Sequence, residues 1–140
     1  MKAKSFSVKV KEKIKPFNKI IKVDSDKSLS IRSFLIGSIC QNISTVTNVL
    51  ESEDVKSTIE ACKKLGVKIV KSSSGSYKIY GKGLGSLFAK KNTVINCFNS
   101  GTLARLLLGI LSTTPNIEII MTGDSSVSYT HLRAHETVSH

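Results

Sequence analysis

Apolar residues recur at helical spacing in three segments of the chain. The first segment, 28–40, predicts a helix with an apolar stripe made of Leu29, Ile31, Leu35, Ile36 and Ile39. A second helix is expected to begin at Ser52, a preferred N-cap residue, and to stop at Gly66. The third segment, 101–111, is so rich in leucine that the predicted helix is expected to be buried.

Alternating and β-branched segments lie between these helices and predict strands. The predicted strands cover residues 5–10, 18–23, 44–50, 67–71, 77–80 and 116–122. The serine-rich segment 72–76 is typical of a hairpin loop between two of them. Strands that alternate with helices indicate an α/β fold with helices packed on a sheet. Because the hairpin interrupts the alternation, a single Rossmann unit is excluded.

The length and composition are those of one folded domain. The chain has 140 residues, of which 40% are hydrophobic, and this is enough for a core. No apolar run is long enough to cross a bilayer, and the first residues lack the apolar core of a secretory signal. Cys40, Cys62 and Cys97 fit no metal-site spacing and leave an odd number for disulfides. We therefore expect a cytoplasmic protein without a metal, in which the cysteines are small core residues.

The net charge of +11 has two interpretations. It indicates an anionic partner, such as nucleic acid, an acidic membrane surface or a phosphorylated metabolite. Gene composition alone can also make a chain rich in Lys, Ile, Ser and Asn, and therefore basic, whatever its function. We favour this interpretation for most of the lysines. Aromatic residues are sparse and are not interleaved with the basic ones, so a base-stacking surface is not indicated.

Two segments place a hydroxyl or a glycine beside a cation at the predicted start of a helix. They are 26–32, Asp-Lys-Ser-Leu-Ser-Ile-Arg, and 99–105, Asn-Ser-Gly-Thr-Leu-Ala-Arg. Helix N-termini present free N–H groups and positive dipole ends, which suit phosphate or carboxylate. A cation there opposes the dipole, and a charge such as Arg105 in an apolar run is costly to bury unpaired. Both costs favour an anion-binding site made by the two helix starts.

Two further motifs are weaker. The segment 81–85, Gly-Lys-Gly-Leu-Gly, lacks the Gly-Lys-Ser/Thr ending of a P-loop and the spacing of a dinucleotide fingerprint, so we interpret it as a turn. His131 and His135 are spaced to share a helix face, but no carboxylate lies between them and no third ligand is evident. Neither motif therefore adds a predicted site.

Several pieces of the chain match, in order, the pattern of one enzyme family. The pieces are 26–32, 46–55, 65–67, 99–102 with Arg105, and 122–124. By these motifs, in register from about residue 14 to about residue 127, the chain resembles the N-terminal part of 5-enolpyruvylshikimate-3-phosphate synthase, or 3-phosphoshikimate 1-carboxyvinyltransferase. The resemblance implies transfer of the enolpyruvyl group from phosphoenolpyruvate to the 5-hydroxyl of shikimate 3-phosphate. Phosphate is released, and no metal or organic cofactor takes part.

The resemblance also implies which residues bind the two substrates. Lys27 would contact both and is the expected catalytic residue. Shikimate 3-phosphate would be held by Lys27, Ser28 and Arg32. The phosphoenolpyruvate side would consist of Lys27, Asn99, Gly101, Thr102 and Arg105. These residues belong to the two helix starts that the pattern of charges and hydroxyls indicates independently.

The implied fold is the inside-out α/β barrel of the enolpyruvyl transferases, built from βαβαββ units and truncated in this chain. Residues 1–17 would give a strand to the other, C-terminal domain, and 18–127 would form part of the N-terminal domain. Residues 128–140 match nothing in the family and are interpreted as artefactual. In the family the remaining catalytic groups lie downstream of the region that this chain matches. These 140 residues alone are therefore expected to be inactive. The full enzyme is expected to be a monomer.

The chain departs from the family pattern at three places. Asp24 and Ser25 stand where the family has Pro-Gly, and Phe98 stands where it has Gly. Arg133 is out of register with the Arg-Pro pair of the family. An alternative hypothesis is a small basic domain without catalysis that binds phosphorylated metabolites or nucleic acid. Under the family hypothesis neither sequence-specific nucleic acid binding nor membrane binding is expected.

Overall fold

The computed structural model describes residues 7, 9, 18, 20 and 23–128. The elements in order are α1 (Lys27–Ile39), β1 (Ile43–Val46), α2 (Glu53–Lys64), β2 (Lys68–Ser73), β3 (Ser76–Tyr80), β4 (Thr93–Asn96), α3 (Gly101–Leu111), β5 (Ile119–Thr122) and α4 (Ser125–Ser128). The predicted α/β class is confirmed. No helix in this described part is long and apolar enough to cross a membrane.

The helix starts are fixed by short polar side chains. The Oδ1 atom of Asp26 accepts a hydrogen bond from Leu29 N at 2.6 Å, and Ser100 Oγ accepts one from Leu103 N at 3.3 Å. Each bond satisfies one of the free N–H groups of the first helical turn. Ser52 occupies the predicted N-cap position of α2, but its side chain makes no capping bond. Its buried Oγ has no hydrogen-bond partner among the described residues.

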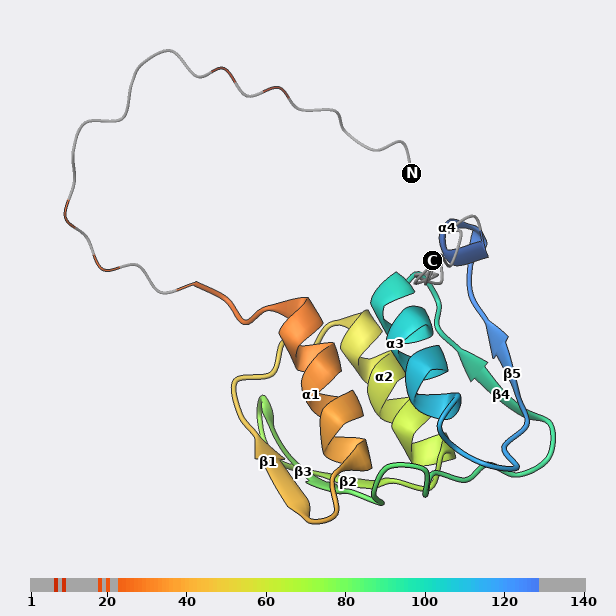
Figure 1. Cartoon of the computed structure of the whole chain (residues 1–140). Helices are drawn as coiled ribbons and strands as arrows, with labels where there is room; N and C mark the ends of the chain where they lie inside the picture. Colours follow the sequence, from red (N-terminus) through yellow and green to blue (C-terminus); the bar gives the residue numbers. More distant parts are fainter. Residues whose placement is uncertain (1–6, 8, 10–17, 19, 21–22, 129–140) are drawn as a thin grey trace, which may run out of the picture.

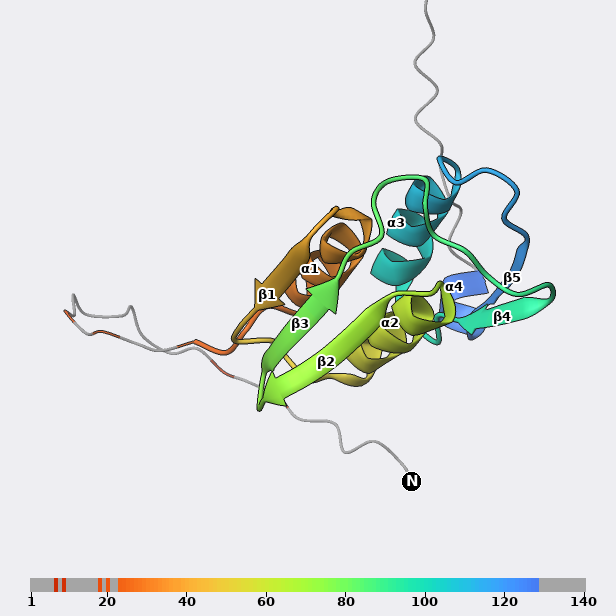
Figure 2. The same ribbon diagram turned by 90° about the horizontal axis from the view of Figure 1, so that it is seen from below.

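Two small sheets flank the helices. In the first, β3 lies between β1 and β2 and is antiparallel to both, with Tyr80 opposite Ile43 on one side and Lys68 on the other. Figure 2 shows these strands side by side, with α1 and α2 behind them. In the second sheet β4 and β5 are parallel, and α3 is the crossover between them. The αβαββ order up to β3 is that of a βαβαββ unit without its first strand.

The three long helices run in the same direction beside the sheets. Figure 1 shows the N-terminal ends of α1, α2 and α3 at one end of the molecule. A single core joins helices and sheets, and Ile31, Phe34, Ile79, Leu103 and Leu107 within it are at most 1% exposed. Cys62 and Cys97 are also buried, as expected, whereas Cys40 is half-buried. Burial raises the pKa of the Cys62 thiol to about 11.

Several strand predictions were wrong in extent. The segment predicted as a strand over 44–50 leaves the sheet after Val46, because Asn48 turns the chain with a φ of 57°. The last strand is shorter than 116–122, since Asn116 also has a positive φ of 54°. The described residues of the predicted strand 18–23 carry no regular structure. Most of 5–10 lies outside the described residues, as do His131, Arg133 and His135.

The predicted helices have two corrections and the strands one omission. The apolar stripe predicted for 28–40 is wrong at Leu29 and Ile36, which are 67% and 58% exposed. The helix 101–111 has the predicted bounds, but it is not buried on all sides, since Leu106 and Leu108 are 37% and 42% exposed. The strand β4 was not predicted, because four residues that follow Lys90, Lys91 and Asn92 are too few for an alternation signal.

The glycine-rich segment 81–85 closes the C-terminal end of α1. Lys82 N donates to Ser38 O and Gly83 N donates to Cys40 O, each at 2.9 Å. A Cβ atom on Gly81 would lie 2.1 Å from Cys40 O, so only glycine fits this close approach. The segment is therefore an ordered cap that satisfies carbonyl groups at the helix end. This is a structural role, as the sequence analysis favoured.

Candidate functional site

Lys27 is the first residue of α1, and its charge is paired. Its Nζ lies 2.7 Å from Oδ2 of Asp54, which is in the first turn of α2. The Asp54 side chain is 10% exposed and that of Lys27 is 51% exposed, so one member of the pair still faces solvent. Asp54 thus supplies, from within the protein, an opposite charge that offsets part of the cost that Lys27 incurs against the helix dipole.

Asp54 was not among the predicted site residues. The signal that could have found it is the acidic first turn after Ser52, where Glu53 and Asp54 follow one another. Such a turn normally indicates only a favourable interaction with the helix dipole. The structure shows that Glu53 serves a local ion pair with Lys56, whereas Asp54 reaches across to α1.

Ser28 and Arg32 complete the predicted part of α1. Ser28 is half-buried and Arg32 is exposed. Within the described residues, Arg32 has no ion-pair or hydrogen-bond partner. Because Arg32 lies beyond the first turn, the dipole penalty that the sequence analysis invoked for it is small. Its guanidinium is instead a cation with all its donors available.

The second predicted group surrounds the start of α3. Asn99 and Arg105 are exposed, while Gly101 and Thr102 are half-buried. No ion pair of Arg105 occurs in the described part of the chain. The expectation that Arg105 is a buried charge was wrong, because only the face with Leu103 and Leu107 turns to the core. No atom lies within 4 Å of the position that a Cβ on Gly101 would take, so this helix start borders open space.

The structure gathers these residues at one end of the molecule. The starts of α1, α2 and α3 lie side by side in Figure 1, and the ion pair of Lys27 with Asp54 joins the first two. The bodies of α1 and α3 also pack together. Among the described residues no hydrogen bond or ion pair links the side chains of 27–32 with those of 99–105. The two groups thus share an end without a hydrogen bond or ion pair between their side chains in the described structure.

Of the residues that depart from the family pattern, Asp24 and Phe98 are exposed and Ser25 is half-buried. Phe98 has a φ of 48°, a left-handed conformation that glycine adopts without strain, which accounts for a glycine at this position in the family. Its carbonyl accepts a hydrogen bond from Asp124 N at 2.8 Å. Its side chain lines a groove along α2 with Glu53, Lys56 and Ser57. Asp24 lies two residues before Asp26, the N-cap residue of α1.

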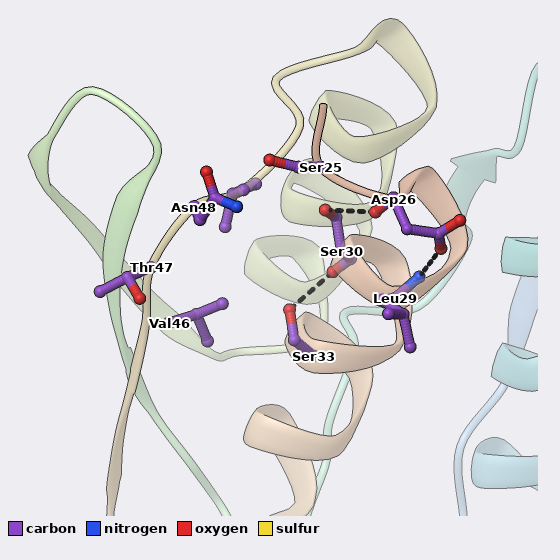
Figure 3. Close-up of a pocket in the computed structure, with 9 residues that line it drawn as sticks. Ser25, Asp26, Leu29, Ser30, Ser33, Val46, Thr47 and Asn48 are labelled. Atoms are coloured by element: carbon purple, nitrogen blue, oxygen red, sulfur yellow. Dashed lines mark hydrogen bonds between the residues drawn. The ribbon is translucent and has the colours of Figure 1, made fainter. Parts of the chain in front are cut away.

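A pocket of about 260 Å³ lies between α1 and the segment after β1, but it is not the predicted site. Figure 3 shows its lining, which includes Ser25, Asp26, Ser30 and Ser33 and none of the predicted residues. The Ser30 and Ser33 hydroxyls donate to the carbonyl groups of Asp26 and Ser30, at 2.8 and 2.7 Å. These two hydroxyl hydrogens are therefore already used within α1, and the polar residues Ser25, Thr47 and Asn48 also line the pocket. No group of three His, Cys, Asp or Glu that could hold a metal occurs in the described residues.

Comparisons with known proteins agree with one another. The model of the family EPSP synthase (3-phosphoshikimate 1-carboxyvinyltransferase) matches residues 11–129. The 3-phosphoshikimate 1-carboxyvinyltransferase of Streptococcus agalactiae is 42% identical over 108 residues, which are 77% of this chain and 25% of that protein. That of Dinoroseobacter shibae is 38% identical over 112 residues, 80% of this chain and 24% of that protein.

A solved structure gives the same picture. The EPSP synthase from Acinetobacter baumannii is similar with a TM-score of 0.71 and 38% sequence identity. The similarity covers 80% of this chain and 25% of that chain. The chain therefore spans about a quarter of the length of the curated relatives it matches.

Proposed function

This chain belongs to the EPSP synthase family, and we propose that the protein containing it transfers an enolpyruvyl group from phosphoenolpyruvate to the 5-hydroxyl of shikimate 3-phosphate. The family match over residues 11–129 supports the proposal most strongly. The exposed cations at the shared helix end also support it, since both substrates are anions. The alternative of an unrelated basic domain has no comparable support.

The α1 residues are proposed to bind shikimate 3-phosphate. Arg32 supplies a guanidinium that has no partner among the described residues, and Ser28 supplies a hydroxyl in the first turn. Lys27 is proposed to contact both substrates, with Asp54 holding its ammonium in place at 2.7 Å. Charge-assisted hydrogen bonds of this kind are about twice as strong as neutral ones. They would stabilise the negative charges of the substrates and of the transition state.

The α3 start is proposed to form the phosphoenolpyruvate side. Asn99 and Thr102 offer polar side chains, and Gly101 leaves space beside the helix N-terminus for a ligand oxygen to approach backbone N–H groups. Arg105, exposed one turn further along, would pair with the phosphate or carboxylate of phosphoenolpyruvate.

Because the chain spans about a quarter of its relatives, we propose that polypeptide outside these residues supplies the acid and base groups. Residues 18–127 are proposed as part of the N-terminal domain, 1–17 as a strand of the other domain, and 128–140 as a segment without a role in it. The proposed setting is the cytoplasm, and the proposed complete enzyme is a monomer without a cofactor.

A titration with shikimate 3-phosphate, followed by NMR of the 140-residue chain, tests the proposed site. Replacing Arg32 with Gln should weaken binding by roughly 1.5–3 kcal/mol, about tenfold or more, because one charge-assisted contact is lost. The control is Lys90→Gln, which removes an exposed cation beside the C-terminal end of α2. Equal affinities for the wild type and both variants would remove Arg32 from the site.

A further inference from the structure

The segment from residue 47 to 52, which joins β1 to α2, is held on two sides. On one side Val49 N donates to Gly75 O at 3.0 Å, in the turn between β2 and β3. On the other side Leu50 N donates to Ser30 Oγ of α1 at 3.1 Å. The Val49 side chain is 7% exposed and anchors the segment in the core. The segment is thus the junction of α1, α2 and the hairpin.

Glu51 makes most of the polar contacts of this junction. Its Oε1 atom accepts hydrogen bonds from Tyr77 OH at 2.7 Å and from Gly75 N at 3.0 Å. Lys71 Nζ lies 2.7 Å from the same oxygen and 2.9 Å from Oε2. One carboxylate therefore gathers three donors from two strands and the turn between them. The Glu51 side chain is 30% exposed, so the cluster lies at the edge of the solvent.

The electrostatics of the cluster agree with this geometry. The Lys71 ammonium, the Tyr77 hydroxyl and the Gly75 N–H lower the pKa of Glu51 to about 2. Glu51 in turn raises the pKa of Lys71, and burial followed by the Glu51 hydrogen bond raises the pKa of Tyr77. The carboxylate is thus kept charged wherever the protein is folded near neutral pH.

Both members of the Lys27–Asp54 pair are attached to this junction. Asp54 lies three residues after Glu51, in the first turn of α2, so the position of Glu51 sets where α2 begins. Ser30, which is 6% exposed, donates its hydroxyl to Asp26 O at 2.8 Å while it accepts from Leu50 N. Figure 3 shows this hydroxyl directed at Asp26, the N-cap residue beside Lys27.

We propose that Glu51 and Ser30 are positioning residues that fix the Lys27 ammonium against Asp54, Glu51 through the start of α2 and Ser30 through the start of α1. The importance of this placement for substrate binding rests on the proposed function, but the placement itself does not. Ser30 ties the two helix starts to each other, and Glu51 ties their junction to the hairpin. The packing of α1 on α2 brings the two helices together, and these two ties set the distance between Nζ and the carboxylate.

The test observes the Lys27 ammonium directly, in a proton–nitrogen NMR spectrum of lysine side chains without substrate. Its signal is assigned by its disappearance in Lys27→Arg, and Asp54→Asn gives the position of an unpaired ammonium. We expect Glu51→Gln to move the signal at least halfway toward that position. The control is Glu60→Gln, which removes another glutamate–lysine pair, with Lys63 at 2.8 Å, but touches no junction. We expect it to leave the Lys27 signal unchanged.

A milder variant keeps the test decisive if Glu51→Gln fails to fold. Tyr77→Phe removes one donor and retains the ring, which packs edge-on against Phe34 with centroids 5.2 Å apart. It should move the Lys27 signal in the same direction by a smaller amount. An unmoved signal in a folded Glu51→Gln or Tyr77→Phe protein would overturn the proposal. This NMR test is made without substrate. If the wild type fails to bind shikimate 3-phosphate in a separate titration, that result counts against the proposed function and leaves the proposal on Glu51 and Ser30 untouched.

Discussion

The two ends of the α1 helix differ in what their polar groups contact. At the C-terminal end the loop 81–85 donates backbone N–H groups to Ser38 O and Cys40 O. At the N-terminal end Arg32 is exposed without a partner among the described residues, and so is Arg105 at the same end of α3. The C-terminal end of α1 is thus capped by the protein itself, and we call it the closed end. The N-terminal end keeps donors for a ligand, and we call it the open end.

Both ends carry a sequence that is typical of phosphate binding. A glycine-rich loop and a hydroxyl beside a cation at a helix start are both found in such sites. The difference is that the glycine loop uses its N–H groups on carbonyl oxygens, while Arg32 and Arg105 have no acceptor among the described residues. A motif therefore indicates a ligand site only where the fold has left its donors without acceptors.

Replacing Gly81 with Ala should disrupt the loop that caps the C-terminal end of α1. It should cause the largest loss of stability among these variants. The new Cβ would lie 2.1 Å from Cys40 O and 2.6 Å from Gly37 O, and both are backbone atoms that cannot rotate away. We expect a loss of about 3 kcal/mol in the free energy of unfolding, measured by urea titration.

The matched control is Gly109→Ala in α3, where no atom lies within 4 Å of the new Cβ. Alanine favours a helix over glycine by about 1 kcal/mol, so this variant should be more stable than the wild type. A Gly81→Ala protein as stable as the wild type would mean that the loop does not close the helix end.

Replacing Arg105 with Gln should separate binding from stability at the open end. Because Arg105 is exposed and unpaired in the described structure, its loss should change the free energy of unfolding by less than about 0.5 kcal/mol. Affinity for phosphoenolpyruvate should fall about tenfold, since a charge-assisted contact is worth roughly 1.5–3 kcal/mol. Calorimetry of the 140-residue chain measures both. A clear loss of stability with unchanged affinity would make Arg105 a structural residue.

Sequence reasoning predicted best the elements whose signals are local. The helix 101–111 has the predicted bounds, and α1 differs from its predicted range by one residue at each end. The signals that set these bounds are contained within the segments. The buried face of α1 is not, since Leu29 and Ile36 of the predicted stripe are exposed. The strand β4 escaped prediction, because four residues become a strand only through pairing with β5 far along the chain.

The candidate site likewise combines residues that a local motif predicts with contacts that depend on packing. Lys27, Ser28 and Arg32 could be selected from a local motif, and their proximity to the start of α3 follows from the parallel helices. The pairing of Lys27 with Asp54 could not be predicted, since it depends on how α1 and α2 pack against each other. The burial of Arg105 was predicted wrongly, because an apolar run does not reveal which face meets the core.

Two variants of Phe98 should measure the backbone strain stored at the open end. Its φ of 48° is costly for any residue with a Cβ but not for glycine. Phe98→Gly should therefore be more stable than Phe98→Ala by about 1 kcal/mol, although both lose the same aromatic contacts. Thermal unfolding of the two variants isolates the backbone effect. Equal stabilities would mean that the left-handed conformation carries no strain.

The smallest expected effect is the pH dependence of the stability that Glu51 contributes to the fold. Lys71, Tyr77 and Gly75 lower the pKa of Glu51 from 4.5 to about 2 in the folded protein. A depressed folded pKa means that Glu51 stabilises the fold above about pH 4.5 and loses this contribution as the pH falls toward about 2. The difference in melting temperature between the wild type and Glu51→Gln should therefore shrink as the pH falls from about 5 to about 2. Glutamine does not titrate, so the difference reports Glu51 alone. A difference that stays constant over this range would mean that the carboxylate does not bind its three donors tightly, and that the open end is held by packing.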